Sequence, residues 1–362
     1  MNRILPADEL FRRTGVAYQP FNTLYQLAAI QKETPELIGK AKTLLMVPSY
    51  FHYRLTGVCA NEYTMASTSQ MVNAETGNWD YEIIGRLGLP CDLFGELHRP
   101  GSRVGRFSPQ IRAELGFDCC VVQPATHDTA SAVVAVPCEQ DGFAYISSGT
   151  WSLIGTELPS PNTTEASRLA GFTNEGGYRG RYRYLKNIMG LWMIQSARRE
   201  WREAGEEYGY DRLCELAREA DDFPSRVPVE DTRFLAPESM IAEVQAACRE
   251  SGQPVPHTVA EISAVIYRSL AAGYREALTE IEKNTGRRFD ALCIVGGGSK
   301  AGYLNELTAR ETGRRVLAGP GEATAIGNLA VQMISTGALT GLRNARRVIR
   351  ASFGVETVEV PK

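Results

Sequence analysis

A short polar segment, Thr126–Thr129, combines a carboxylate, an imidazole and two hydroxyls between an apolar stretch and a run of small residues. A carboxylate at such a position can accept a proton from a substrate hydroxyl. Asp128 could instead cap the helix that the small residues predict, because a side-chain oxygen there accepts hydrogen bonds from free helix N–H groups. Position alone favours the cap, and His127 alone is more typical of a half-buried structural histidine than of a catalyst.

Two glycine-containing segments could bind an anionic group. Ser147–Thr150 joins two apolar stretches, and its hydroxyls and glycine would allow backbone N–H groups to converge on a phosphate. Its alternative is an ordinary hairpin turn. Gly296–Lys300 follows another apolar stretch, where glycine permits a close backbone approach and a helix N-terminus favours negative charge. Its alternative is a close strand–helix turn.

The second of these segments also resembles a dinucleotide-binding pattern. Gly296, Gly298 and Ala301 match GxGxxA, although the spacing does not fit a Walker A loop. An NAD(P)-dependent dehydrogenase is therefore one alternative function. It is disfavoured because no second mononucleotide-binding half follows, and because the segments at 126–129 and 147–150 would have no role in it.

Hydrophobic periodicity predicts the elements that must position these residues. It predicts helices over 21–33, 48–57 and 259–284, strands over 120–125 and on both sides of 147–150, and a strand running into a helix over 181–201. After residue 290 the predicted order is strand, loop, helix, strand, loop, helix. This order indicates an α/β fold with a mixed or parallel sheet. We place the domain boundaries at 1–138 and 139–338, with a C-terminal tail over 339–362.

Composition excludes several classes of protein. The 362 residues suggest two or three domains, and a formal net charge of −3 argues against charge-driven nucleic-acid binding. No apolar run is long enough to span a membrane, and the N-terminus lacks a signal-peptide pattern, so we expect a cytoplasmic protein. The eight cysteines form no CxxC pair, which argues against a zinc site. Cys119 and Cys120 are interpreted as reduced thiols in a buried strand.

Taken together and in order, these segments resemble the FGGY family of carbohydrate kinases. The resemblance runs almost from end to end and lies in PFNTLYQL (20–27), MVPSYFHYRLTG (46–57), EYTMAST (62–68), HDTASAV (127–133), YISSGTWSLIG (145–155), NEGG (174–177), LKNIMGLWMIQ (185–195), EVQAACRE (243–250), CIVGGGSK (293–300) and AGPGEATAIGN (318–328). The combination of HDT, SSGTW and KNIMGLW is typical of the branch that acts on L-rhamnulose.

The resemblance implies an actin-like (ribonuclease H-like) α/β fold, with a sugar-binding lobe over 1–138, a nucleotide-binding lobe over 139–338 and a cleft between them. It implies that Asp128 is the general base for in-line transfer of the ATP γ-phosphoryl group to the 1-hydroxyl of L-rhamnulose. The substrate-binding residues that it implies are His127, Asp128, Thr129 and Asn187. The ATP-binding residues that it implies are Thr150, Gln195, Gly296, Gly297 and Gly298.

The same resemblance implies ATP and Mg²⁺ as cofactors, a small ketose as substrate, no nucleic-acid or membrane partner, and a monomer or homodimer. Family members begin with a DxG-type phosphate loop that helps to hold Mg²⁺, and the only nearby string here is Asp141-Gly142-Phe143. We therefore expect a first lobe truncated at its front, with unknown metal ligands. The alternatives are a catalytically impaired fragment that binds only nucleotide or sugar, and a kinase of another ketose.

Overall fold

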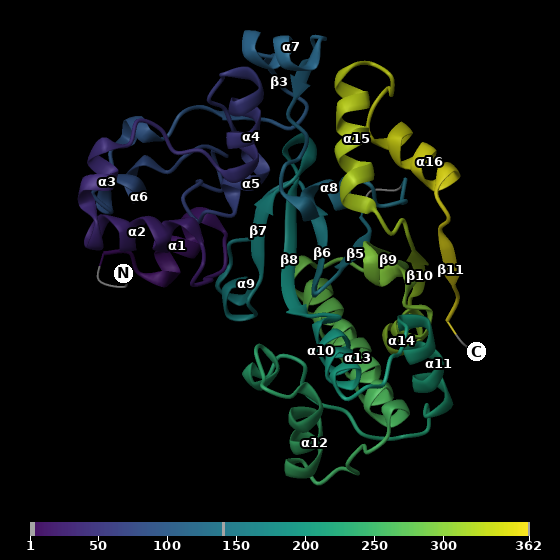
Figure 1. Ribbon diagram of the computed structural model, residues 1–362. Helices are drawn as coiled ribbons and strands as arrows, with labels where there is room; N and C mark the ends of the chain where they lie inside the picture. Colours follow the sequence, from purple (N-terminus) through teal and green to yellow (C-terminus); the bar gives the residue numbers. More distant parts are fainter. Residues whose placement is uncertain (1–3, 140–141, 361–362) are drawn as a thin grey trace. The chain divides into compact units, whose positions relative to one another are not determined.

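The structure is a computed structural model that describes residues 4–139 and 142–360 (Figure 1). The chain divides into two compact units, each built from three segments. The first unit comprises Met1–Ala135, Glu157–Leu185 and Thr324–Arg346, and the second comprises Val136–Thr156, Lys186–Ala323 and Arg347–Lys362. The domain boundary predicted between 138 and 139 lies beside residues 140–141, which are outside the described residues, as is Asp141 of the string 141–143.

The first unit is mainly helical. Its helices are α1 (Ala7–Thr14), α2 (Thr23–Glu33), α3 (Pro35–Lys40), α4 (Val47–Thr56), α5 (Tyr63–Ser67), α6 (Tyr81–Arg86), α7 (Pro109–Leu115), α8 (Asp128–Val134), α9 (Glu165–Leu169) and all but the first residue of α15 (Ala323–Ser335). The predicted helices over 21–33 and 48–57 are confirmed as α2 and α4. Apolar side chains of α2 join a core in which Leu24, Met71 and Ile84 have no exposed surface.

Short strands complete the first unit. β1 (Asn61–Glu62) pairs in parallel with β2 (Leu97–His98), whereas β3 (Arg103–Arg106) pairs antiparallel with β4 (Cys120–Val122). β7 (Thr173–Gly176) pairs antiparallel with the first half of β8 (Tyr182–Met189).

The prediction that Cys119 and Cys120 are buried is wrong, because both are exposed. β4 belongs to a two-stranded sheet, and only its later residues, Val121 and Val122, reach the core. The apolar run predicts the strand but contains no information about which of its residues are covered.

The second unit contains a mixed sheet in the order β11-β10-β9-β5-β6. Its strands are β5 (Ala144–Ser148), β6 (Trp151–Leu158, whose last two residues belong to the first unit), β9 (Ala291–Val295), β10 (Arg315–Ala318) and β11 (Glu356–Val358). β9 pairs in parallel with both β5 and β10, whereas β5–β6 and β10–β11 are antiparallel. The predicted α/β class and the turn at 147–150 are thereby confirmed. Residues 339–362 contain α16 (Leu342–Ser352) as well as β11.

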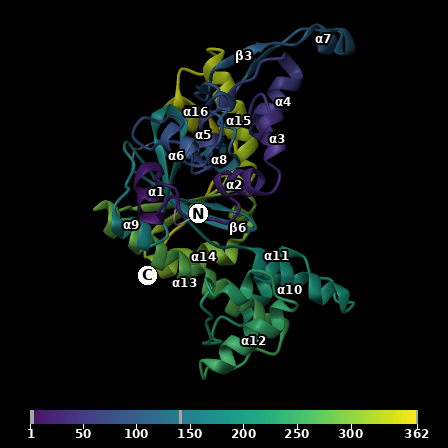
Figure 2. The same cartoon turned by 90° about the vertical axis from the view of Figure 1, so that its left-hand side faces the viewer.

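One long helix organises the rest of the second unit. The predicted helix over 259–284 is confirmed as α13 (Val259–Thr285), which starts at a capping box between Thr258 and Glu261 and ends before Gly286. Against it pack α10 (Trp192–Glu203), α11 (Tyr210–Glu219), α12 (Met240–Glu250) and α14 (Gly302–Thr312) (Figure 2).

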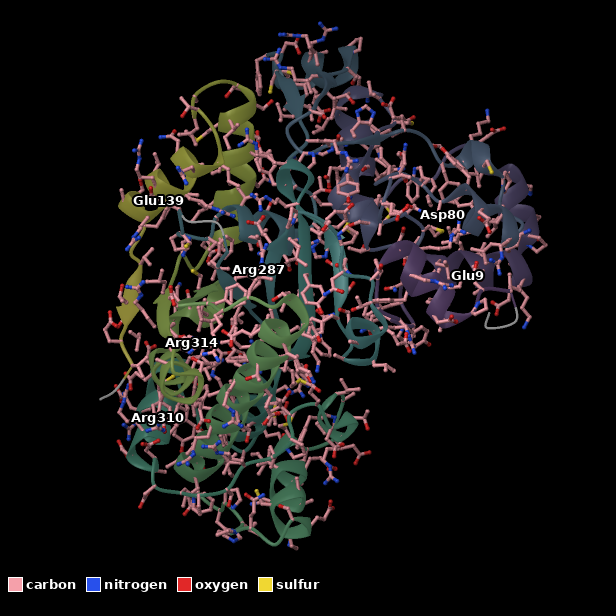
Figure 3. The ribbon with its side chains drawn as sticks, turned by 180° about the vertical axis from the view of Figure 1, so that it is seen from behind. Glu9, Asp80, Glu139, Arg287, Arg310 and Arg314 are labelled. Carbon is pink, nitrogen blue, oxygen red and sulfur yellow. The ribbon has the colours of Figure 1, made fainter. Side chains whose placement is uncertain are left out.

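Ion pairs on the surface of the second unit join its helices. Arg310 on α14 lies 2.7 Å from Asp221, two residues after α11, and Arg314 lies 3.1 Å from Glu282 of α13 (both arginines are labelled in Figure 3). No described helix is both long enough and apolar enough to cross a membrane.

Candidate functional site

Asp128 is the first residue of α8, and its side chain is 78% exposed. Its Oδ1 accepts hydrogen bonds from the backbone N–H of Thr129 (2.6 Å) and from the Thr129 hydroxyl (3.3 Å). The N-cap position belongs to His127, so Asp128 is not the residue that caps the helix. The structure therefore presents an oriented, solvent-accessible carboxylate, which is the geometry that a general base requires.

The turn that carries Asp128 is held by a carboxylate with no exposed surface, Glu62. One oxygen, Oε2, accepts from the backbone N–H (3.1 Å) and the hydroxyl (2.7 Å) of Thr126, and Oε1 accepts from the N–H of Thr64 (2.8 Å). The Thr64 hydroxyl accepts in turn from the N–H of His127 (3.2 Å). Burial raises the pKa of Glu62, and the donors from Thr64 and Thr126 oppose that shift.

Glu62 does not appear among the residues that the sequence predicts. Its local signal is its place before the helix of EYTMAST, where it is the N-cap residue of α5. Its contact with Thr126 spans 64 positions of sequence and has no local signature.

The His127 side chain is only 19% exposed, and its Nδ1 lies 3.5 Å from Oδ1 of Asp128. Burial lowers the pKa of His127, the nearby Arg183 guanidinium lowers it further, and the carboxylates of Glu175 and Asp128 oppose these effects. The net direction favours a neutral imidazole beside the exposed carboxylate.

Residues from the C-terminal part of the first unit hold both ends of α8. The Thr324 hydroxyl donates to the backbone oxygen of Asp128 (3.2 Å). At the other end, the buried Arg346 donates to the carbonyl of Val133 (2.9 Å) and to Glu157 (2.9 Å). Asp128 thereby lies at the start of a helix that is hydrogen-bonded at both ends.

In the second unit, the turn after β5 meets the start of α10. The Thr150 hydroxyl donates to Oε1 of Gln195 (3.4 Å). The N–H groups of Leu191 and Trp192 donate to the carbonyls of Gly149 (3.0 Å) and Thr150 (3.1 Å). Two of the predicted ATP-binding residues, Thr150 and Gln195, are thus in contact.

This contact depends on a glycine. A Cβ atom added to Gly190 would lie 2.6 Å from the backbone carbon of Trp151 and 2.7 Å from the nitrogen of Ser152. Because neither backbone atom can move aside cheaply, a side chain at 190 would separate the two segments.

The predicted glycine loop lies against the same turn. Gly297–Lys300 form a short 3-10 helix, η4, directly after β9 and Gly296. A Cβ atom added to Gly298 would lie only 2.0 Å from Oγ of Ser148, whereas nothing lies within 4 Å of one added to the exposed Gly297. All five predicted ATP-binding residues therefore lie in segments that meet around the end of β5. Hydroxyls and backbone N–H groups of this kind can bind phosphate oxygens.

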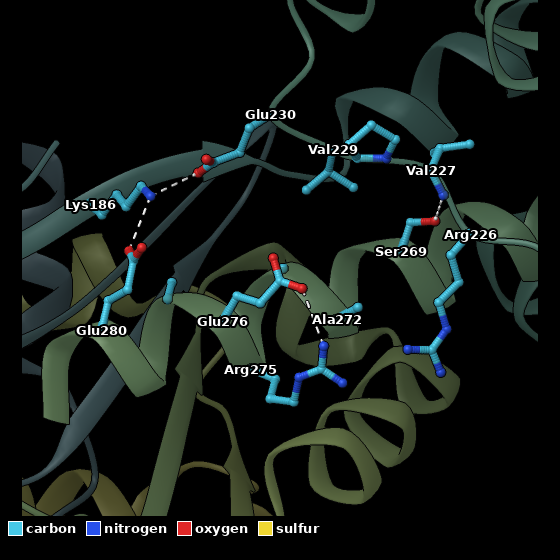
Figure 4. A pocket seen from close by; sticks show the side chains of 13 residues that line it. Lys186, Arg226, Val227, Val229, Glu230, Ser269, Ala272, Arg275, Glu276 and Glu280 are labelled. Carbon is cyan, nitrogen blue, oxygen red and sulfur yellow. Dashed lines mark hydrogen bonds and ion pairs between the residues drawn. The ribbon is translucent and has the colours of Figure 1, made fainter. Parts of the chain in front are cut away.

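Asn187 lies exposed on β8, in the second unit, whereas His127, Asp128 and Thr129 lie in the first. The adjacent Lys186 is on the opposite face of the strand. It lines a cavity of about 380 Å³ (Figure 4). There its ammonium group lies 3.3 Å from Glu230 and 3.2 Å from Glu280. None of the residues predicted to bind a ligand lines this cavity.

Within the described part of the chain, no group of three or more His, Cys, Asp or Glu side chains could hold a metal ion. We therefore assign no residue as a magnesium ligand.

Comparison with known proteins identifies related sequences over both halves of the chain. Residues 2–135 match the N-terminal domain of the FGGY family of carbohydrate kinases, and residues 144–336 match its C-terminal domain. The rhamnulokinase of Oceanobacillus iheyensis is 45% identical over 350 residues, which are 97% of this chain and 73% of that protein. The rhamnulokinase of Halalkalibacterium halodurans is 46% identical over 349 residues, which are 96% of this chain and 74% of that protein.

Solved structures show the same fold at low sequence identity. A gluconate kinase from Lactobacillus acidophilus has a TM-score of 0.77 at 17% identity, with 99% of this chain and 71% of that chain covered. A glycerol kinase from Plasmodium falciparum, solved with ADP, has a TM-score of 0.77 at 13% identity, with 96% and 70% covered. The predicted actin-like α/β fold is confirmed by these similarities.

Proposed function

The chain belongs to the FGGY family of carbohydrate kinases, and we propose that it transfers the γ-phosphoryl group of ATP to the 1-hydroxyl of L-rhamnulose. The observation that carries the choice of sugar is the identity of 42% to 46% with proteins named rhamnulokinase, over 96% or 97% of this chain. The dehydrogenase alternative is wrong, because the segment with Gly296, Gly298 and Ala301 lies within the matched domain of a kinase family.

We assign the role of general base to Asp128. Its carboxylate accepts the proton of the sugar 1-hydroxyl while that oxygen attacks the γ-phosphorus. The new oxygen–phosphorus bond forms as the bond to the β,γ-bridging oxygen breaks, and ADP leaves. The exposure of this carboxylate and the two hydrogen bonds from Thr129 support the assignment, since they leave the group accessible and hold its orientation.

The sugar would also contact His127, Thr129 and Asn187. An imidazole and an amide can donate to or accept from sugar hydroxyls. Such hydrogen bonds distinguish one ketose from another, because a wrong sugar leaves polar groups of the site unpaired.

The nucleotide would occupy the segments that meet around β5. Thr150, Gln195 and the glycines at 296–298 offer hydroxyl, amide and backbone donors, and their contacts with one another support a single site. Mg²⁺ enters as the MgATP complex and neutralises phosphate charge when bound. Phosphoryl transfer depends chiefly on positioning and on such charge stabilisation.

The test is release of ADP by the purified chain with MgATP, measured with L-rhamnulose and with a panel of other ketoses that includes L-fuculose and D-xylulose. We expect L-rhamnulose to stimulate release most. Faster release with another ketose would instead identify a kinase of that sugar. Thermal stabilisation by nucleotide or sugar without turnover would identify a binding-only protein.

A further inference from the structure

Two segments of the sequence, EYTMAST (62–68) and NEGG (174–177), take no part in the proposed chemistry. In the structure they form α5 and most of β7, which lie in the same unit as the turn that precedes α8. A Cβ atom added to Gly176 would lie 2.5 Å from the ring carbon Cε1 of Tyr63. The N–H of Gly176 also donates to the Ser67 hydroxyl (2.7 Å). β7 therefore packs directly against α5.

The N-cap residue of α5, Glu62, has no exposed surface and is surrounded by donors. On α5, its carboxylate accepts from the N–H of Thr64 (2.8 Å), from the Thr64 hydroxyl (2.5 Å) and from the N–H of Met65 (3.2 Å). On the turn before α8, it accepts from the N–H (3.1 Å) and the hydroxyl (2.7 Å) of Thr126. An ionised carboxylate fits this position, because it only accepts hydrogen bonds.

The Thr64 hydroxyl connects the same carboxylate with His127. It donates its proton to Glu62 and accepts from the N–H of His127 (3.2 Å). Both residues that precede Asp128 are thus hydrogen-bonded to Glu62, Thr126 directly and His127 through one hydroxyl. The backbone that leads into Asp128 therefore takes its position from a buried carboxylate on another element.

We propose that Glu62 is a positioning residue of the phosphoryl-transfer site, which holds the backbone of Thr126 and His127 so that the Asp128 carboxylate meets the sugar hydroxyl; this role rests on the proposed function of Asp128. Stability alone is a weak reason to bury a charge, because desolvation of a carboxylate opposes folding and its hydrogen bonds only offset that penalty. Placement of the base is a stronger reason, because an error of about 1 Å can reduce a rate by about 10²-fold.

Glu62→Gln tests this role at nearly unchanged volume. It replaces one accepting oxygen with an NH₂ group, which would face N–H or hydroxyl donors and should displace the turn. We expect kcat with MgATP and L-rhamnulose to fall by up to about 10²-fold. The KM for MgATP should not change, because all the proposed ATP-binding residues belong to the second unit.

Asp80, labelled in Figure 3, provides a matched control in the same unit. It is a buried carboxylate that caps another short helix, α6, and it accepts from Arg13, Asn73 and Ile83 rather than from the turn before α8. Asp80→Asn should therefore destabilise the fold while leaving the kcat of the folded protein unchanged. Wild-type kcat in a folded Glu62→Gln protein, or an equal loss of kcat in both variants, would overturn the proposal.

A double-mutant cycle shows whether Glu62 acts through Asp128. If it does, Glu62→Gln should lower kcat far less in an Asp128→Asn background than in the wild type, because residues that act as a unit are not additive. Equal losses in the two backgrounds would overturn the proposal, since a smaller fraction of folded protein reduces both rates alike. If Glu62→Gln does not fold, Thr126→Val carries the same cycle by removing one hydroxyl donor, and Thr126→Ser should restore kcat.

Hydrogen–deuterium exchange tests the anchoring without turnover. In the full chain, Glu62→Gln should speed exchange at the N–H groups of Thr126 and His127, whereas Asp80→Asn should not. Unchanged exchange in Glu62→Gln would overturn the proposal. If the wild-type chain turns over no ketose, the proposed function fails, while this comparison still decides whether Glu62 holds the turn.

Discussion

At the scale of single residues, the exposed carboxylate of Asp128 is the group on which the proposed chemistry depends. We expect Asp128→Asn to lower kcat by about 10²–10⁴-fold, the usual contribution of a positioned general base. The amide has nearly the same shape and can still accept through its oxygen from Thr129, so the start of α8 should remain intact. Steady-state kinetics with MgATP and L-rhamnulose measure the effect.

A matched substitution separates loss of the base from loss of the fold. Glu75→Gln makes the same chemical change at an exposed carboxylate of the first unit and should leave kcat unchanged. An Asp128→Asn protein that folds normally and retains full turnover would exclude Asp128 as the base.

At the scale of elements, the glycine loop after β9 is shaped by its contact with β5. We expect Gly298→Ala to lower the free energy of unfolding by about 1–3 kcal/mol, because overpacking forces a backbone shift where the added methyl meets Ser148. Gly297→Ala is the control, since its methyl would meet nothing within 4 Å. Urea unfolding of both variants measures the difference.

The cause of the difference in stability between the two alanine variants can be tested by removing the Ser148 side chain. Adding Ser148→Gly to Gly298→Ala removes the two nearest atoms that the methyl would meet, Oγ at 2.0 Å and Cβ at 2.6 Å, and should recover part of the lost stability. Equal destabilisation by the alanines at 297 and 298 would show that the contact with Ser148 is not what requires glycine.

Elements whose signals are local were predictable from the sequence. α13 shows its period, its capping box at Thr258 and its terminal Gly286 within one continuous stretch. The signals for the strand–turn–strand at 147–150 and for the glycine loop after β9 likewise lie in residues that are adjacent in the sequence.

Features that depend on distant contacts were not predictable in this way. Glu62 reaches Thr126 across 64 positions, and Arg346 reaches Val133 across 213. Neither hydrophobic periodicity nor a sequence motif predicts either contact. The exposure of Cys119 and Cys120 was mispredicted for the same reason, since burial depends on which elements cover a strand.

At the scale of the whole molecule, the candidate residues divide between the two units. The proposed base and its neighbours His127 and Thr129 belong to the first unit, whereas all the proposed ATP-binding residues belong to the second. Each unit takes segments from separate parts of the chain, so α8 in the first unit depends on Thr324 and Arg346, which come about 200 positions later.

This division predicts separate footprints for the two ligands in hydrogen–deuterium exchange. A non-hydrolysable ATP analogue with Mg²⁺ should slow exchange at 148–150, 190–195 and 296–300, because backbone donors in these segments would bind the phosphates or be covered by the nucleotide. L-Rhamnulose alone should slow exchange at 126–131, where the turn and the start of α8 meet the sugar. In Asp128→Asn the nucleotide footprint should persist, since Asp128 belongs to the first unit and all the proposed ATP-binding residues belong to the second. A nucleotide footprint at 126–131 with none at 296–300 would contradict the assignment of the nucleotide to the second unit.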